Sequence, residues 1–273
     1  MVSHETIPGK SARCELIRNL PLGPEIKRLD FIWSGPAPRG GQFFLIKPQR
    51  SVVFLGRPLS VAGWEPVPGD PPGQVRCLVR FLLTPRGKGT GELAALRTGG
   101  EAELTGPLGN AWGDFLPPQG EAKPAALIGG GMGIAPLFAF AGELPEGRFD
   151  FYAGFRTFRG EDEPYGLLGP AAYRAREVFI AAEDGTAGHT GRIPDLLDPA
   201  KYAAIYACGP EPMLRLVAAS AKQERVPCFV SLERHMACGV GACLGCTVRT
   251  VRGNRRCCAD GPVFNAEELC FEQ

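Results

Sequence analysis

Five cysteines near the C-terminus form the strongest chemical pattern in this sequence: Cys238, Cys243, Cys246, Cys257 and Cys258. The first three have C-x4-C-x2-C spacing, and the last two follow a basic, hairpin-like segment. Iron–sulfur clusters are held by cysteine thiolates, and this spacing with a distant fourth cysteine is the plant-type [2Fe–2S] arrangement. Glycines let such a loop turn tightly around inorganic sulfide, and its N–H groups can point at the anionic cluster. The interleaved glycines are Gly239, Gly241 and Gly245.

A zinc site, a disulfide pair and buried small hydrophobic residues are the alternatives to an iron–sulfur cluster. Zinc sites favour paired C-x2–4-C knuckles, and the first gap here is at that limit. The later cysteines are adjacent, which suits neither zinc ligation nor an unstrained disulfide between neighbours. The pattern therefore favours a [2Fe–2S] cluster.

Length and composition indicate a globular protein of about two domains, at roughly 150 residues per domain. The chain has 273 residues, of which 44% are hydrophobic and 22% are charged, as in ordinary soluble proteins. A net charge of +1 gives no sign of nucleic acid or an anionic membrane as a partner. We expect no secretory signal and no membrane span, because no apolar leader or long apolar run is present. Ten cysteines then favour metal chemistry in the cytoplasm over a disulfide framework.

The N-terminal part of the chain predicts an antiparallel β-barrel or sandwich. Short segments with alternating apolar residues are separated there by glycine and proline clusters. We predict a short helix over Thr90–Leu96, with Thr90 as its N-cap. The predicted strands are Cys14–Leu20, Ile26–Trp33, Gln42–Ile46, Val52–Phe54, Val75–Leu83 and Glu101–Leu104.

After a linker at residues 117–123, strands alternate with helices from Ala125 onwards. This alternation predicts a doubly wound parallel α/β sheet covered by helices. One helix is predicted at Leu137–Leu144, and another after Cys208 with Pro212 in its first turn. The predicted strands are residues 125–128, Phe149–Ala153, Val178–Ala182, Ala203–Ala207 and Phe229–Leu232, the last closing the sheet.

Two strand-to-helix junctions of this sheet carry nucleotide-binding signals. The first is the turn Gly129, Gly130, Gly131, Met132 and Gly133, and the second is Cys208, Gly209, Pro210 and Glu211. Glycines let backbone amides approach a phosphate, and both junctions lie at the edge where such sheets bind ligands. A structural glycine turn and a buried cysteine are the alternatives. Glu183 and Asp184 end another strand near this edge, where an acid can meet a ribose.

Two weaker motifs lie in the β-rich part. Arg57, Pro58, Leu59 and Ser60 are predicted at a strand end, where arginine can neutralise a pyrophosphate. The loop with Gly89 and Thr90 precedes the short helix and can present N–H groups and a hydroxyl to phosphate oxygens.

Taken in order, these four motifs and the cysteine loop resemble the ferredoxin–NADP reductase superfamily over nearly the whole chain. R-P-x-S, G-x-G-T, G-G-G-x-G-x-x-P and C-G-P-x-x-M are recurring elements of that superfamily. The resemblance implies FAD on the barrel and a pyridine nucleotide on the α/β sheet. It places Ser60 near the isoalloxazine, Arg57 and the Gly89–Thr90 loop near the phosphates, and the segment Leu82, Leu83 and Thr84 against the flavin.

The segment ERHMACGVGACLGC, followed by CADGPVF, is further similar to the electron transfer subunits of dihydroorotate dehydrogenase B, the NAD-dependent bacterial form. This resemblance implies that Cys238, Cys243, Cys246 and Cys258 hold the cluster. Cys258 is preferred to Cys257 because the last ligand of that family directly precedes a short acidic segment ending in DGPVF. Ala259 stands where an acidic residue is common, and no role is assigned to Cys257.

The resemblance implies an electron-transfer chain with no catalytic residue of its own for dihydroorotate. Electrons from the FMN of a separate catalytic subunit would pass through [2Fe–2S] and FAD to NAD+, in pyrimidine biosynthesis. Two copies of each subunit would form a heterotetramer. The implied domains are an FAD-binding barrel at 1–116, an NAD-binding α/β domain at 117–230 and a [2Fe–2S] domain at 231–273.

Two other functions compete with this one. The chain could be the reductase subunit of a ferredoxin-, hydrogenase- or sulfur-linked complex within the same superfamily. It could also be a non-enzymatic, zinc-bound binding module with a degenerate barrel. The sequence does not distinguish NAD from NADP.

Overall fold

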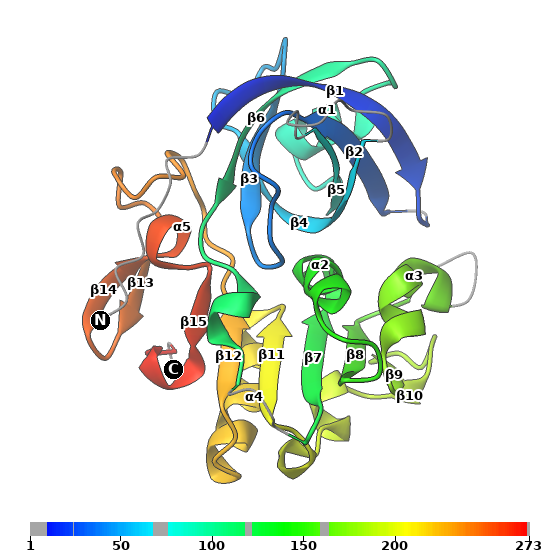
Figure 1. Cartoon of the computed structure of the whole chain (residues 1–273), viewed down its shortest axis with the longest axis vertical. Coiled ribbons are helices and arrows are strands. Elements are labelled where there is room, and N and C mark those ends of the chain that lie inside the picture. The colour runs from blue at the N-terminus through cyan, green and yellow to red at the C-terminus, as the bar shows by residue number, and fades with distance from the viewer. Residues whose placement is uncertain (1–9, 24, 68–75, 118–121, 159–163, 272–273) are drawn as a thin grey trace.

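A barrel lies against one side of an α/β sheet, and the C-terminal segment lies beside the edge of that sheet (Figure 1). The computed structural model describes all residues except 1–9, 24, 68–75, 118–121, 159–163 and 272–273. Part of the predicted linker and Val75 of one predicted strand lie outside the described residues. Among the described helices, none has the length and apolar character needed to cross a membrane.

Six antiparallel strands close the predicted barrel in the order β1-β2-β5-β4-β3-β6. Its core is aromatic: the Trp33 and Phe81 rings meet the Phe44 ring edge-on, with centroids 5.0 and 5.5 Å away. Such edge-to-face pairs add to the burial of apolar surface. The strands are Lys10–Pro21 (β1), Lys27–Trp33 (β2), Phe43–Pro48 (β3), Arg57–Pro66 (β4), Cys77–Leu83 (β5) and Glu101–Leu108 (β6).

Three local predictions for the barrel are wrong. Residues 52–54 form a loop rather than a strand, and Arg57 begins β4 instead of following a strand. Helix α1 spans Lys88–Ala95 with Gly87 as its N-cap, so Thr90 is the third helical residue. The Thr90 hydroxyl instead accepts the N–H groups of Arg86 and Gly87, at 2.9 and 3.1 Å. Its oxygen therefore shapes the loop before the helix.

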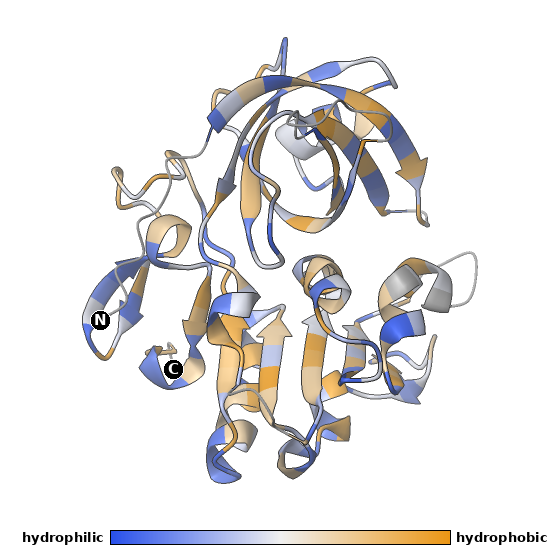
Figure 2. Cartoon of the chain, viewed as in Figure 1, coloured by the Kyte–Doolittle hydropathy of each residue, from blue (hydrophilic) through white to orange (hydrophobic). Residues whose placement is uncertain are grey.

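The second layer is a seven-stranded sheet in the order β10-β9-β8-β7-β11-β12-β15. Successive residues of β7 belong to different hydrophobic clusters. Leu127 lies with Leu137 of helix α2 (Ile134–Glu143), whereas Ile128 lies with Leu214 and Val217 of helix α4 (Glu211–Gln223). Helices therefore cover both faces, which confirms the doubly wound prediction. Figure 2 shows the matching hydrophobic colour along the central strands. The parallel strands are Ala125–Gly130 (β7), Phe149–Phe155 (β8), Val178–Ala182 (β9), His189–Thr190 (β10), Ala204–Cys208 (β11) and Cys228–Ser231 (β12).

The helices of this layer are Ile134–Glu143 (α2), Pro164–Arg174 (α3) and Glu211–Gln223 (α4). Short 3-10 turns occupy Trp112–Phe115 (η1), Gly131–Gly133 (η2), Ile193–Leu196 (η3), Pro199–Lys201 (η4) and Ala266–Glu268 (η5). Asp150 of β8 is fully buried, and it is paired with Arg176 at 2.6 Å and with the Tyr202 hydroxyl at 2.8 Å. These partners satisfy a carboxylate that burial would otherwise destabilise.

The C-terminal segment is joined to the sheet rather than separate from it. A hairpin of Thr247–Thr250 (β13) and Gly253–Arg256 (β14) leads into Cys257–Asp260 (α5). Strand Val263–Asn265 (β15) then pairs antiparallel with β12, so β12 does not close the sheet as predicted. The Asn110 side chain ties this segment to the end of the barrel, because it donates to the Val263 carbonyl at 2.8 Å and accepts its N–H at 3.0 Å.

The barrel meets α2 through a close contact at Gly40. The Gly40 N–H donates to the Glu143 carboxylate at 2.5 Å, and burial raises the pKa of Glu143. A Cβ on Gly40 would lie 2.6 Å from the Phe140 nitrogen, which is closer than atoms pack. The two layers can therefore approach this closely only because residue 40 has no side chain.

We predict that Gly40→Ala separates the barrel from α2 and lowers the free energy of unfolding by about 1–3 kcal/mol, the usual cost of overpacking. Gly142→Ala is the matched control, since Gly142 lies on α2 and a Cβ there meets open space. It should be neutral or stabilising by up to about 1 kcal/mol, because alanine favours helix. Denaturant unfolding of both variants measures the difference, and equal stabilities would show that the contact at Gly40 is not limiting.

Candidate functional site

The four thiols predicted to hold a cluster lie together as two pairs. The Cys243 N–H donates to the Cys238 Sγ, and the Cys258 N–H donates to the Cys246 Sγ, both at 3.4 Å. Within the described ranges, no three His, Cys, Asp or Glu side chains converge on a single metal-ion position. Two thiol pairs fit a binuclear [2Fe–2S] cluster, in which four cysteines serve two irons.

Backbone amides surround these sulfurs. Burial raises the pKa of Cys238, but N–H groups of Cys243, Val240 and Ala242 outweigh it and lower that pKa to about 6. The Gly241 N–H donates to the Cys258 Sγ at 3.2 Å. Burial and the neighbouring Cys246 nevertheless raise the pKa of Cys258 to about 12. A bound iron ion would supply the positive charge that keeps such a thiol deprotonated.

The loop backbone meets the predicted need for glycine at two of three positions. Gly239 and Gly241 have φ of +71° and +80°, in the left-handed region. Gly245 does not, and its neighbour Leu244 has φ of +60°. A left-handed non-glycine residue costs about 1–2 kcal/mol, so the surrounding loop must hold Leu244 in place.

Cys257 differs from its neighbour Cys258 in what its thiol contacts. The Cys257 thiol is fully buried and donates to the Leu232 carbonyl at 3.1 Å. Burial raises the pKa of Cys257 to about 12. The Cys258 thiol instead meets Cys246. Cys257 therefore links α5 to the chain that follows β12, while Cys258 completes the group of four.

Arg57 and the first turn of α1 form a candidate phosphate cradle on the barrel. A Cβ on Gly89 would lie 3.2 Å from the Arg57 Cδ, so Arg57 packs directly against the first turn of α1. The Arg57 Nη2 donates to the Leu55 carbonyl at 2.8 Å, whereas its buried Nε has no hydrogen-bond partner among the described residues. First-turn helix amides and a guanidinium with an unused donor suit the pyrophosphate of FAD.

Strand β4 connects this cradle to the junction of the two layers. It begins at Arg57, passes Ser60, and reaches Ala62, which packs against Leu82 and against Ala135 of α2. The six residues from Arg57 to Ala62 span about 16 Å of strand, at about 3.3 Å per residue step. A long ligand lying along β4 therefore reaches from the cradle to the sheet. Pro58 and Leu59 lie within this stretch, opposite Leu45 and Phe44 of β3.

The two predicted nucleotide motifs touch each other. A Cβ on Gly133 would collide with the Cys208 carbonyl, and one on Gly130 would lie 2.9 Å from Pro210. Gly129 pairs with Cys208 in the sheet register, and Gly209 has φ of +156°. These glycines therefore bring two strand-to-helix junctions into contact. Glu211 does not face the cavity but pairs with Arg234 at 3.2 Å, which ties α4 to the cluster segment.

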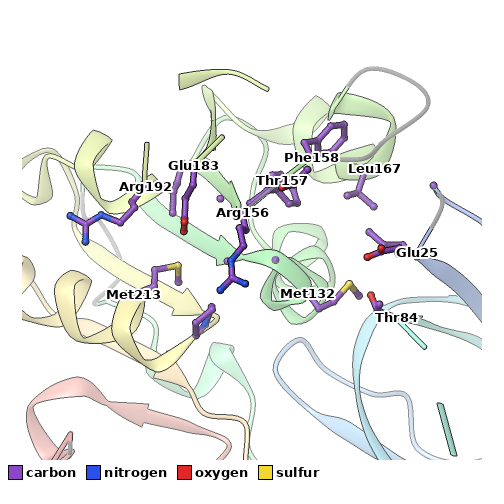
Figure 3. A pocket seen from close by; sticks show the side chains of 18 of the residues that line it. Glu25, Thr84, Met132, Arg156, Thr157, Phe158, Leu167, Glu183, Arg192 and Met213 are labelled. Atoms are coloured by element: carbon purple, nitrogen blue, oxygen red, sulfur yellow. The ribbon is translucent and has the colours of Figure 1, made fainter. Parts of the chain in front are cut away.

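A cavity of about 680 Å³ opens between the barrel and the carboxyl edge of the sheet (Figure 3). Its volume is typical of sites for small ligands and cofactors. Among the residues that line it are five for which the sequence predicts nucleotide or flavin contacts: Thr84, Gly130, Gly131, Met132 and Pro210. Leu82 and Leu83 do not line it, because they are buried in the layer junction and in the barrel core respectively.

Sequence reasoning missed three arginines that line this cavity, Arg86, Arg156 and Arg192. Arg156 follows β8 directly, at the carboxyl edge where ligands of such sheets bind. Its place at the end of a predicted strand could have identified Arg156 from the sequence. Arg86 and Arg192 lie in irregular segments, and only the folded arrangement brings them to the cavity.

Comparison with known proteins assigns a family to this arrangement. The model of the iron–sulfur cluster binding domain of dihydroorotate dehydrogenase B matches residues 233–270. A Clostridium perfringens protein is 40% identical over 235 residues, which are 85% of this chain and 87% of that protein. A Caldanaerobacter subterraneus protein is 34% identical, and the match covers 95% of this chain and 98% of that protein. Both are named dihydroorotate dehydrogenase B (NAD(+)), electron transfer subunit.

Solved structures agree on the fold. The structure of an NADH-dependent reduced ferredoxin–NADP oxidoreductase, described for flavin-based electron bifurcation, superposes with a TM-score of 0.73 at 26% identity. The match covers 95% of this chain and 90% of the chain in that solved structure. A ferredoxin NADP+ reductase from Neisseria gonorrhoeae with bound FAD and NADP gives 0.57 at 16% identity, over 79% of this chain and 92% of that one.

We predict that Cys258→Ser removes the cluster whereas Cys257→Ser retains it. The first change takes away one thiol of the Cys246 pair, and the second keeps a hydroxyl that can donate to the Leu232 carbonyl. Iron and acid-labile sulfide content, with electron paramagnetic resonance of the reduced protein, measures both variants. A normal cluster in Cys258→Ser, or none in Cys257→Ser, would reverse the assignment of the fourth ligand.

Proposed function

The chain belongs to the family of electron transfer subunits of dihydroorotate dehydrogenase B (NAD(+)), and we propose that it carries electrons between a dihydroorotate-oxidising subunit and NAD+ in pyrimidine biosynthesis. One observation carries this proposal: a single chain presents a four-thiol loop, a pyrophosphate cradle and a nucleotide cavity. FAD, when bound, supplies exchange between one-electron and two-electron carriers, and [2Fe–2S] supplies single-electron transfer.

The protein's own residues hold and separate these groups. We assign the cluster to Cys238, Cys243, Cys246 and Cys258. Arg57 and the amides of Gly89 and Thr90 neutralise the FAD pyrophosphate, as their contact supports. Ser60 and Thr84 position the flavin ring where the barrel meets the sheet. The Gly129–Gly133 turn and the Cys208–Glu211 junction receive the nicotinamide nucleotide.

Three further features are part of the proposal. The chain divides into an FAD domain at 1–116, an NAD domain at 117–230 and a cluster domain at 231–273, although β15 of the last joins the sheet of the second. The active assembly is a heterotetramer with two FMN-containing catalytic subunits. Its location is the cytoplasm, because ten free cysteines suit a reducing compartment.

The catalytic subunit docks on the loop that carries the thiols. Val240 and Leu244 of this loop are 54% and 62% exposed, although both are apolar and flank the exposed Cys243. On the barrel, Phe54 and Val52 are 87% and 78% exposed. Exposed apolar residues that gather at one place mark interaction sites.

These two groups lie on either side of Leu45. A Cβ on Gly239 would lie 2.8 Å from the Leu45 Cδ1, and one on Gly56 would lie 3.1 Å from the Leu45 Cβ. The loop that carries the thiols and the barrel loop therefore both pack against Leu45. A partner seated there brings its own redox group next to the cluster and excludes water from it.

The function is tested by anaerobic copurification with the catalytic subunit of dihydroorotate dehydrogenase. We expect FAD, iron and acid-labile sulfide in the complex, and NAD+ reduction that depends on dihydroorotate. Cys243→Ser should abolish that reduction while the subunits stay associated, because Cys243 holds iron. Capture of only a hydrogenase or ferredoxin-linked subunit, or a protein with zinc and no flavin, would contradict the assignment.

The docking face gives a separate prediction. Val240→Glu and Leu244→Glu should each weaken binding of the catalytic subunit at least tenfold, since a buried unpaired charge at an interface costs more than about 1.4 kcal/mol. Tyr173→Glu is the control, because Tyr173 is 83% exposed on α3, on the opposite side of the molecule (Figure 1). Calorimetric titration of the subunits, with equal FAD and iron content in all variants, measures the effect. Unchanged binding of both loop variants would place the interface elsewhere.

A further inference from the structure

The hairpin of β13 and β14 ends in an arginine that lies beside the thiols. Arg256 is the last residue of β14, and its partner in the hairpin register is Thr247, the residue after Cys246. The next N–H along the chain, that of Cys257, donates to the Cys246 carbonyl at 3.0 Å. The main chain of Arg256 is therefore held next to one proposed cluster ligand and two residues before another, Cys258.

One carboxylate fixes the orientation of the Arg256 guanidinium. Asp260, the last residue of α5, accepts the Arg256 Nε on its Oδ2 and the Arg256 Nη2 on its Oδ1, both at 2.9 Å. The Asp260 Oδ2 also accepts the main-chain N–H of Arg256 at 2.7 Å. Such a bidentate pair holds a guanidinium in one plane. Because Nε and Nη2 face the carboxylate, the third nitrogen, Nη1, points away from it.

Nη1 of Arg256 meets the backbone of the loop that carries the thiols. A Cβ on Gly241 would lie 3.0 Å from this Nη1 and 3.3 Å from the Arg256 Cδ. The Gly241 N–H in turn donates to the Cys258 Sγ at 3.2 Å. A single loop residue therefore contacts the guanidinium and also binds the sulfur of a proposed ligand. The guanidinium lies between Asp260 and the loop.

The charges agree with this geometry. The hydrogen bond to Asp260 raises the pKa of Arg256, and the negative charges of Asp260, Cys258 and Cys246 add to the rise. Arg256 therefore acts through space on both thiols of the buried pair. The other arginines of this hairpin are exposed: Arg249, Arg252 and Arg255.

We propose that Arg256, oriented by Asp260, raises the reduction potential of the [2Fe–2S] cluster and so favours electron transfer onto it from the catalytic subunit. The inference rests on the proposed assignment of the cluster to this loop. Net charge, hydrogen bonds to sulfur and solvent exposure set the potential of such clusters. Reduction adds one electron and breaks no bond, so a fixed cation nearby stabilises the reduced form more than the oxidised form. Arg256 touches neither iron nor substrate and is a positioning residue.

The test is a potentiometric titration of the FAD- and cluster-loaded protein, followed by electron paramagnetic resonance of the reduced cluster, so it needs no turnover. Arg256→Gln keeps hydrogen-bonding groups but removes the charge, and it should lower the potential. At a fixed solution potential, the ratio of reduced to oxidised cluster should fall about threefold or more, the effect of a unit charge several ångströms away in water. Arg256→Lys keeps the charge and should retain most of the wild-type potential.

Arg252→Gln is the matched control. Arg252 also pairs with a carboxylate, that of Glu268 at 3.6 Å, but it lies in the turn at the other end of the hairpin. Its removal should leave the potential at the wild-type value, and iron and acid-labile sulfide content show that each variant carries the cluster.

Three results would overturn the role of Arg256: an unshifted potential in Arg256→Gln, an equal shift in Arg252→Gln, or a shift in Arg256→Lys as large as in Arg256→Gln. Loss of the cluster from Arg256→Gln would also overturn it, because the residue would then serve assembly of the loop. A wild-type protein without the resonance of a [2Fe–2S] cluster would instead overturn the cluster assignment itself.

Discussion

Backbone contacts that exclude any side chain hold the three parts of this chain at fixed distances. Gly40 presses on the main chain of α2, Gly133 lies under the Cys208 carbonyl, and Gly239 rests on Leu45. Each contact joins a different pair of parts: barrel to sheet, glycine turn to second junction, and cluster loop to barrel. Gly40 and Gly133 meet packed backbone, which cannot yield as a flexible side chain does, whereas Gly239 meets the side chains of Leu45 and Leu108. The first two contacts therefore fix the spacing of the parts that they join. Electron transfer between groups held by one chain depends on that spacing.

The second requirement is to accommodate negative charge. A cluster with four thiolates, a pyrophosphate and a nucleotide all bring anionic groups to a chain of net charge +1. The protein stabilises these anionic groups with local backbone dipoles and individual cationic side chains rather than with a basic surface. Amides of the cluster loop point at sulfur, the first turn of α1 faces Arg57, and glycine amides end β7. Donors fixed in this way need little rearrangement when charge moves.

Most of the fold could be predicted from the sequence. Apolar and polar residues alternate along barrel strands, and the buried strands of the sheet are apolar, so both kinds of strand have a local sequence pattern. The failures have local causes. Residues 52–54 are apolar enough for a strand but lie on a loop, where Val52 and Phe54 are exposed. Thr90 was predicted as an N-cap because hydroxyl residues are favoured there, but its oxygen shapes the preceding loop instead. Antiparallel pairing of β15 with β12 joins segments about thirty residues apart, and no local pattern encodes it. The thiol spacing predicted that Cys238, Cys243 and Cys246 gather, and the family resemblance supplied Cys258. The grouping into pairs and the cavity arginines depend on tertiary contacts.

Cys257 shows how the cluster is connected to the rest of the chain. Its thiol bonds the Leu232 carbonyl, while the Leu232 N–H donates to the Pro262 carbonyl at 3.0 Å. Leu232 follows β12, which pairs with β11, and β11 ends at Cys208 beside the glycine turn. Arg234 then reaches Glu211 at the start of α4. A short run of bonded residues therefore leads from the cluster-bearing helix to the nucleotide junctions. Both ends of this run of residues are held by strands β11 and β12.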